Sequence, residues 1–385
     1  MTENSKIRND ALTAIERVAT EVIAPAAATV DQSGAFPEAS IDALGKAGLL
    51  GLISAPEVGG LGADLGTAVR AIERIARACG STAMTTTMHY CGTAVVEAHG
   101  DEATRRELAS GTRFTTLAFS ESGSRSHFWA PVSTATAEGD MVRLDARKSW
   151  ITSASRATDY VWSSRPTAGS EASTLWLVPA NAEGIAPQGQ FHGMGLRGND
   201  STPVVAEGAK VSVSKRLGDD GAGFGIMMQT VLPTFSLLIA AGALGLMSGA
   251  LERTVQHAGG TKFEHLQSNL ASLPTIRAQV ARMSVLTDMV RTLLYDAADA
   301  VTNGREDAML RVLQAKASAG ETALTVVDHA MRVCGGAAFR GDVAVDRYFR
   351  DARAANVMAP TTDQLYDFIG RAVCGLPLFD AADDA

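Results

Sequence analysis

The 385-residue sequence has only four cysteines, and their spacing excludes the usual cysteine-based sites. Cys79, Cys91, Cys334 and Cys374 form no CxxC pair and no Cys/His cluster with zinc-ligand spacing. We therefore expect no metal site, and free, buried thiols such as those of proteins in a reducing cytosol.

The sequence also lacks an apolar run that is long enough to span a membrane. Its most apolar stretch, Leu237–Ala250, covers about 14 residues, whereas a spanning helix needs about 20. The first residues, Met-Thr-Glu-Asn-Ser, are too polar for a signal peptide. We expect a cytoplasmic protein without membrane association, in which Leu237–Ala250 is a buried helix.

An excess of positive charge is missing as well. The net charge is −8 and the pI is about 5.4, which disfavours nonspecific binding of nucleic acid. Hydrophobic residues make up 46% of the chain, enough for a globular protein with a large core. A small anionic ligand stays open, because it needs only a local cluster of basic residues.

Residues 1–112 carry the periodicity of helices. Apolar residues recur at helical spacing over Ala11–Val22, which Pro25 is expected to end, and Pro37 is expected to open the next helix. Further helices are predicted over Thr67–Ala78 and Thr82–Ala98, and the second of these is apolar enough to be buried on most sides. The first third is therefore predicted to be a helical domain.

The period changes to that of strands over residues 113–230. Glu138-Gly-Asp140 is a hairpin signal. The expected strands are Phe114–Phe119, Val132–Ala137, Met141–Asp145, Tyr160–Ser163, Thr174–Pro179 and Lys210–Val213. This middle domain is predicted to be a barrel or a pair of packed sheets.

Residues 231–385 return to helical periodicity, with no strand expected among them. Val285–Leu294 and Leu310–Val333 carry wide apolar stripes. Four long helices in an antiparallel bundle would satisfy this pattern. The predicted fold class is α+β, in the order helical domain, β domain, helical bundle.

Lys148-Ser-Trp-Ile-Thr-Ser153 is the segment of the β domain with the clearest capacity for a ligand. The indole of Trp150 offers a flat apolar face, and the hydroxyl of Thr152 offers a hydrogen bond to a ring edge. An ordinary buried strand has the same composition, so this segment alone does not identify a site.

Ser120-Glu-Ser-Gly-Ser-Arg-Ser-His127 is the densest polar run and follows a predicted strand. Its hydroxyls and backbone N–H groups suit ring carbonyls or phosphates, and a solvated loop has the same composition. The run is neither GxSxG nor a Walker loop. His127 beside Arg125 is interpreted as a surface pair.

Three later segments have both a structural and a ligand-binding interpretation. Cys334-Gly-Gly-Ala-Ala-Phe339 closes a helix, and its glycines permit a capped helix end or close approach of a pyrophosphate. Arg350-Asp-Ala-Arg353 is predicted to form a structural ion pair through Asp351. In Met358-Ala-Pro-Thr-Thr-Asp363, Pro360 breaks the helix and Asp363 is expected to cap the next one.

Taken together and in this order, these segments resemble the acyl-CoA dehydrogenase family of flavoproteins over essentially the whole chain. The Ser120-Glu-Ser-Gly and Lys148-Ser-Trp-Ile-Thr segments resemble the family's two flavin-contacting motifs. The remaining matches are Asp219–Phe224, Ala240–Gly245, Gly335–Phe339 and Arg350–Arg353.

The resemblance implies FAD rather than FMN, bound between the β domain and the C-terminal helices, usually in a homotetramer, with a dimer as the other option. It also implies which residues contact the cofactor. Carried over by position, these are Ser120, Ser126, Trp150, Thr152 and Thr361, with Gly335 and Gly336 approaching the pyrophosphate of a flavin shared with a neighbouring subunit.

The chain departs from the family at the catalytic base. The glutamate that removes the α-proton of the acyl thioester falls at Ala359, and the alternative position falls near Phe235, with Ser236 where an arginine is usual. The family's Arg-x-x-Phe-Gly segment is unrecognisable in Thr261–Leu273.

Three functions remain open from the sequence. The first is desaturation with a relocated base, for which the candidates are Glu121, His127 and Asp363. The second is oxygen activation by a flavin that a separate reductase reduces. The third is a non-catalytic flavin-binding subunit. The expected pocket residues are His89, Phe235, Ser236, Met358 and Ala359, and the expected redox partner is a flavin reductase or an electron-transfer flavoprotein.

Overall fold

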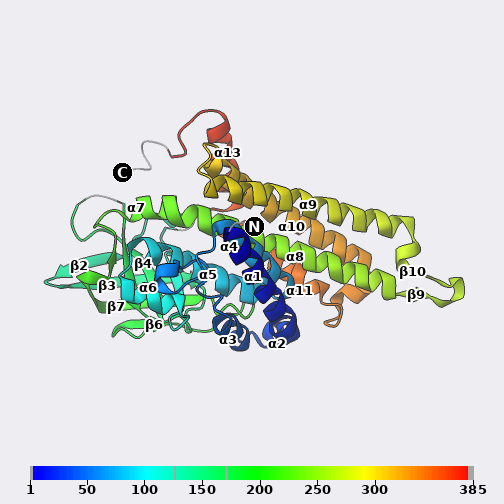
Figure 1. Ribbon diagram of the computed structural model, residues 1–385, viewed down its shortest axis with the longest axis horizontal. Coiled ribbons are helices and arrows are strands. Elements are labelled where there is room, and N and C mark those ends of the chain that lie inside the picture. The colour runs from blue at the N-terminus through cyan, green and yellow to red at the C-terminus, as the bar shows by residue number, and fades with distance from the viewer. Residues whose placement is uncertain (1–2, 125–126, 170–171, 380–385) are drawn as a thin grey trace.

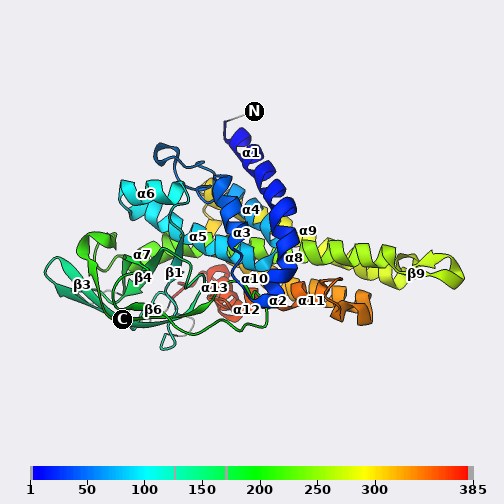
Figure 2. The ribbon, with the colours of Figure 1, turned by 90° about the horizontal axis from the view of Figure 1, so that it is seen from below.

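The computed structural model describes residues 3–124, 127–169 and 172–379. Figure 1 shows an elongated molecule with the strands of the middle third at one end and long helices running to the other. Helices of the N-terminal third lie across the middle (Figure 2), where α4 (Leu65–Ala78) packs on α8 (Leu232–Gly260). This arrangement confirms the predicted α+β class.

Helices fill the N-terminal third, as predicted. A π-helical turn, Ala19–Ile23, joins α1 to α2, and Pro25 lies in the first turn of α2, so the prediction that Pro25 ends the helix is wrong. Proline is tolerated there because its missing N–H is not needed at a helix start. Pro37 precedes α3 instead of opening it. The helices besides α4 are α1 (Glu3–Val18), α2 (Ala24–Ser33), α3 (Glu38–Lys46), α5 (Gly80–His99) and α6 (Glu102–Ala109).

The middle region consists of two four-stranded sheets, with strand orders β1-β4-β5-β8 and β2-β3-β7-β6. Their facing sides share a core that includes Trp162, Trp176 and Val204, which confirms a pair of packed sheets. The strands are β1 (Thr115–Ala118), β2 (Thr134–Glu138), β3 (Met141–Ile151), β4 (Asp159–Ser164), β5 (Thr174–Pro179), β6 (Ile185–Pro187), β7 (Thr202–Ser212) and β8 (Arg216–Leu217).

Most of the strand predictions are confirmed, but β3 runs on to Ile151, past the expected end at Asp145. The β2–β3 hairpin turns at Gly139, as expected, with φ of 69°. However, β7 begins at Thr202, well before the expected Lys210. The strands β6 and β8 were not predicted, because two or three residues at a sheet edge are too few to show an alternating pattern.

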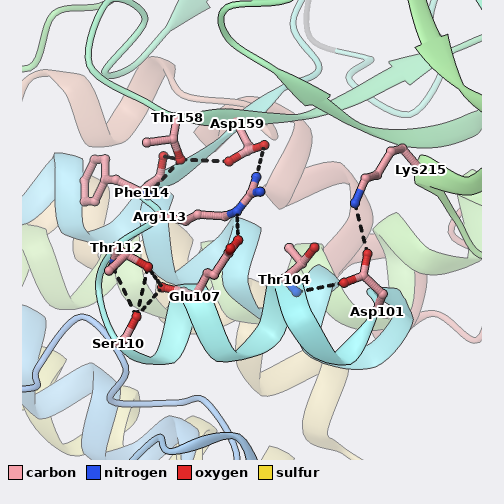
Figure 3. Close-up of polar contacts among 10 residues, drawn as sticks. All are labelled: Asp101, Thr104, Glu107, Ser110, Thr112, Arg113, Phe114, Thr158, Asp159 and Lys215. Carbon is pink, nitrogen blue, oxygen red and sulfur yellow. Dashed lines mark hydrogen bonds and ion pairs between the residues drawn. The ribbon is translucent and has the colours of Figure 1, made fainter.

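Charged contacts fix α6 against the sheets (Figure 3). Arg113 lies between Glu107 of α6 and Asp159 of β4, with 2.6 Å between Arg113 Nη1 and Asp159 Oδ1. Lys215 Nζ lies 3.0 Å from Oδ2 of Asp101, the residue that caps α6. The N-terminal helices and the β domain are thereby held in one orientation.

The C-terminal region is a helical domain, as predicted. It does not consist of the four long helices without a strand that the sequence analysis expected. Three helices are long, and a small ladder of β9 (Lys262–Phe263) and β10 (Ser268–Asn269) separates α8 from α9. Two-residue strands leave no periodic signal in the sequence. The helices besides α8 are α7 (Gly223–Ile226), α9 (Pro274–Thr302), α10 (Ala308–Cys334), α11 (Val345–Ala352), α12 (Ala354–Val357) and α13 (Thr362–Val373).

One helical run, Gly223–Gly260, is long and apolar enough to cross a membrane by composition alone. It is longer than the expected Leu237–Ala250, yet 83% of its most apolar window is buried inside the protein. The run is therefore the core helix that was predicted. The expectation of buried thiols is wrong only for Cys374, which is exposed after the end of α13.

Candidate functional site

A narrow cavity of about 30 Å³ lies between α5 and α8. Its walls include Gly80 and Met84 of α5, Ile239 and Gly242 of α8, and Met358 beyond α12. A Cβ atom at Gly242 would meet nothing within 4 Å, so this glycine leaves the space of the cavity open. The lining is almost entirely apolar, which suits an apolar ligand rather than a charged one.

Asp351 is the one ionisable side chain among the described residues that line this cavity. Its Oδ1 accepts a hydrogen bond from the backbone N–H of Leu196 at 2.6 Å. Burial raises the pKa of Asp351 to about 6, and Asp31 adds to the rise, whereas Arg347 and Arg350 oppose it. The predicted ion pair of Asp351 is wrong, because Arg350 pairs with Asp31 instead, at 2.5 Å.

Glu121, a candidate base, is committed to a buried ion pair. Its Oε1 lies 2.5 Å from Lys148 Nζ, and its Oε2 accepts the backbone N–H groups of Val132 at 2.7 Å and Ser133 at 3.1 Å. Despite burial, Lys148 and these donors lower the pKa of Glu121. Burial lowers the pKa of Lys148 to about 8, so both groups are charged at neutral pH. An ion-paired carboxylate with a lowered pKa is a weak proton acceptor, and the role of Glu121 as a base stays a prediction.

The other two candidate bases lie outside the cavity. His127 is exposed, and its ring meets the edge of Trp129. Asp363 is exposed in the first turn of α13. Asp363 is not the cap of that helix either, because Thr361 holds this position in a capping box with Gln364. Neither side chain lines this cavity, and a base at either position stays a prediction.

The segment Met358–Thr361 joins α12 to α13 beside the cavity. Met358 lines the cavity, as predicted, and Ala359 is partly buried against the core. Behind this segment, Nζ of the buried Lys316 donates to the carbonyl oxygens of Met358 at 2.9 Å and Pro360 at 2.5 Å. No acid side chain occupies position 359.

His89 is a structural residue and not part of the cavity lining. Its Nε2 lies 3.1 Å from the carbonyl oxygen of Leu50, and its Nδ1 accepts the backbone N–H of Thr115 at 3.2 Å. These contacts require a neutral ring with the proton on Nε2, and burial lowers the pKa of His89 to about 4. Both ring nitrogens are therefore occupied, and the role of His89 as a pocket residue stays a prediction.

Phe235 and Ser236 lie on α8 before the part of the helix that lines the cavity. The lining of this cavity on α8 begins at Leu238, so neither residue lines it, and their place in a substrate pocket stays a prediction. Ser236 is buried, and its hydroxyl has no hydrogen-bond partner among the described residues. Phe235 packs partly against the core.

The structure brings two of the expected flavin-contacting segments together. The carbonyl oxygen of Ser120 accepts the backbone N–H of Ser149 at 2.8 Å, next to Trp150. Trp150 is 72% exposed and has a φ of 58°, which turns its side chain out of the strand. Thr152 is buried, with its hydroxyl 3.1 Å from that of Ser201. Ser126 lies outside the described residues.

Gly335 and Gly336 are well separated from the Met358–Thr361 segment. They follow the C-terminal end of α10, about 28 Å along that helix from Lys316 at 1.5 Å per residue. A Cβ atom at either glycine would meet nothing within 4 Å, so the backbone is open to approach. This placement suits a contact with a ligand of a neighbouring subunit, which stays a prediction.

The sequence predicted no site role for Lys316 or Asp351. Lys316 is a single lysine on an apolar face of α10, with Leu313 and Gly320 as its neighbours on that face, and this break in the pattern was the available signal. Asp351 gave no such signal, because it stands in a run of charged residues.

The acyl-CoA dehydrogenase family matches the chain in three successive blocks: its N-terminal domain at residues 8–112, its middle domain at 116–209 and its C-terminal domain at 221–374. The chain belongs to the acyl-CoA dehydrogenase family. The domain boundaries expected after residues 112 and 230 stay predictions.

Individual members of the acyl-CoA dehydrogenase family resemble the whole chain. Cyclohex-1-ene-1-carbonyl-CoA dehydrogenase of Geobacter metallireducens is 29% identical over 97% of this chain and 98% of its own length. Human mitochondrial short-chain specific acyl-CoA dehydrogenase is 29% identical over 88% of this chain and 83% of its own length. Butyryl-CoA dehydrogenase of Megasphaera elsdenii has the same fold, with a TM-score of 0.90 at 23% identity over 97% and 99% of the two chains.

FAD is the cofactor of this family, and the residues present fit it. The exposed indole of Trp150 provides a flat apolar surface, and the buried hydroxyl of Ser153 has no partner among the described residues. Gly335 and Gly336 leave the backbone open to close approach by a cofactor. The chain is accordingly an FAD-dependent oxidoreductase of the acyl-CoA dehydrogenase family.

Proposed function

We propose that this enzyme desaturates a small acyl thioester between its α and β carbons, with the acyl group in the cavity between α5 and α8. The observation that carries the proposal is the composition of that cavity, which is apolar apart from one carboxyl group. The cavity is narrow, at about 30 Å³, so only a small acyl group enters, and the flexible side chains of Met84 and Met358 must move to admit it. Bound FAD supplies the acceptor for the β-hydride.

Asp351 is the carboxyl group that the geometry offers for the α-proton. Its Oδ1 is occupied by the N–H of Leu196, which leaves Oδ2 to accept a proton inside the cavity. A general base works best when its pKa lies near the operating pH, and burial has raised the pKa of Asp351 to about 6. The apolar walls of the cavity exclude water from this carboxylate.

A general base at Asp351 predicts that kcat/KM depends on pH. Because only the carboxylate accepts a proton, kcat/KM rises with pH and levels off above an apparent pKa near 6. Asp351→Asn keeps an acceptor for Leu196 but removes the base, so kcat falls at least 100-fold and the rise with pH disappears. Asp346→Asn on the same helix, a partner of Arg350, is the matched control and keeps the profile.

A second candidate is oxygen activation by a flavin that a separate reductase has reduced. The methyl group of Ala359 at the usual base position and the apolar cavity favour this chemistry, which needs no α-proton base. In that case the partner is a flavin reductase, whereas desaturation passes electrons to an electron-transfer flavoprotein. We place either reaction in the cytoplasm, where such partners operate.

Anaerobic titration of the FAD-loaded enzyme with short-chain acyl-CoAs separates the functions. Bleaching of the flavin by the acyl-CoA alone supports desaturation. Bleaching only with an external reductant, followed by a product that carries an oxygen atom from O₂, supports oxygenation. A flavin that binds but turns over no acyl-CoA under either condition indicates a non-catalytic subunit and overturns the proposal.

A further inference from the structure

We infer that Lys316 is a positioning residue that fixes the Met358–Thr361 segment, and with it the Met358 wall of the cavity. The inference uses the proposed function only in treating the cavity as the substrate site. Lys316 is not itself among the residues that line the cavity.

The geometry of the ammonium group carries the inference. Lys316 is 1% exposed, and its Nζ donates to the carbonyl oxygens of Met358 and Pro360, which flank Ala359 on either side. It forms no ion pair with any residue that the structure describes, and desolvation is the whole cause of its lowered pKa. Burying a lysine without a counter-ion costs free energy. The two hydrogen bonds to backbone carbonyl groups are the favourable contacts that oppose this cost.

The two contacts persist whichever protonation state Lys316 adopts. Burial lowers the pKa of Lys316 to about 7, so the neutral amine and the ammonium are both populated near neutral pH. The neutral amine still has two N–H donors, enough for both carbonyl oxygens. Lys316 therefore holds the Met358–Thr361 segment in both protonation states and does not act as a pH switch.

A second feature of α10 supports the same role. Gly320 lies one turn after Lys316 on the same face of the helix. A Cβ atom at Gly320 would lie 3.1 Å from Asn356 Oδ1 and 3.3 Å from Thr362 Oγ1, so the missing side chain lets the segments before and after Ala359 approach α10 closely. Lys316 and Gly320 together let α10 pack closely against the Met358–Thr361 segment and hydrogen-bond to it.

Hydrogen–deuterium exchange of the FAD-loaded protein tests this role without relying on turnover. Lys316→Met keeps the length of the side chain but removes both donors, and we expect amide exchange over residues 354–362 to become at least tenfold faster, with no change in the centre of α8. Arg332→Gln, an exposed position on the same helix, is the control and leaves both regions unchanged. Unchanged exchange over 354–362 in Lys316→Met overturns the inference.

Activity provides a second readout that a purely structural role does not move. With a displaced Met358 wall, Lys316→Met raises the KM for a short-chain acyl-CoA about tenfold at unchanged melting temperature. If wild-type protein turns over no acyl-CoA, the proposed function fails but the exchange result still decides on Lys316. If the variant does not fold, reductive methylation of native wild-type protein replaces this experiment. We expect Lys316 to stay unmodified while the exposed Lys46 reacts. Rapid modification of Lys316 would show that it does not hold the Met358–Thr361 segment.

Discussion

Ala359 places a methyl group where the family resemblance implies a carboxylate, and it follows directly after a residue that lines the cavity. Ala359→Glu therefore introduces an acid beside the cavity wall, and we expect dehydrogenase turnover of a short-chain acyl-CoA to rise at least tenfold. Ala359→Gln, which has the same shape but no basic oxygen, is the control. Equal activities of the two variants would show that the cavity does not present a thioester to this position.

The residues of the site were predictable only where their role depends on local sequence. The methyl group at position 359 and the cavity contact of Met358 follow from a motif on one short segment. The role of Glu121 was not predictable, because its partner Lys148 lies on another strand and its two backbone donors lie beyond a loop. Asp351 joins the cavity only through the packing of α11 on α8, which no local pattern reports.

At the scale of elements, the pair of Glu121 and Lys148 fixes the Ser120 loop to β3. Glu121→Gln leaves the buried Lys148 without its counter-ion, and we expect the free energy of unfolding to fall by about 3–5 kcal/mol, as for other broken buried pairs. Chemical denaturation at pH 7 measures this loss. Glu138→Gln removes a more exposed partner of Lys210 and is expected to cost about 1 kcal/mol or less.

The denaturation of Glu121→Gln also distinguishes a structural role of Glu121 from a catalytic one. A stability change no larger than that of Glu138→Gln, combined with lost turnover in a folded enzyme, would return Glu121 to the role of a catalytic base.

The elements themselves were predictable in proportion to their length. The helix Thr67–Ala78 and the strand Thr174–Pro179 match the structure closely, because each carries a full run of its period. The continuation of the first helix past Pro25 was not predictable, since a π-helical turn has no sequence signature that competes with proline. The ladder between α8 and α9 is too short for any pattern.

At the scale of the whole molecule, α9 exposes apolar side chains that a monomer leaves in water. Val285 is 59% and Met289 63% exposed, and they lie one turn apart on this long helix. Homotetramers are typical of the family, and such a face suits contact between subunits. Met289→Asp is therefore expected to lower the assembly state, as measured by light scattering coupled to size-exclusion chromatography.

Thr29→Asp, an exposed polar position on α2, is the control for added charge and keeps the assembly state. If Met289→Asp assembles like the wild type, the exposed face of α9 is not a subunit contact.

The order of the three regions was predictable from the sequence because motifs in all three kept the family order. The assembly was predictable only by resemblance, since its contacts lie between chains.

FAD titration of the apoprotein, followed by tryptophan emission and by flavin absorbance, is the most direct test that this chain holds a flavin against Trp150. We expect one FAD to bind per chain and to quench the emission by packing against the exposed indole, and we expect Trp150→Leu to lose a large part of this quenching. A purified protein that stays colourless and takes up no FAD would contradict it.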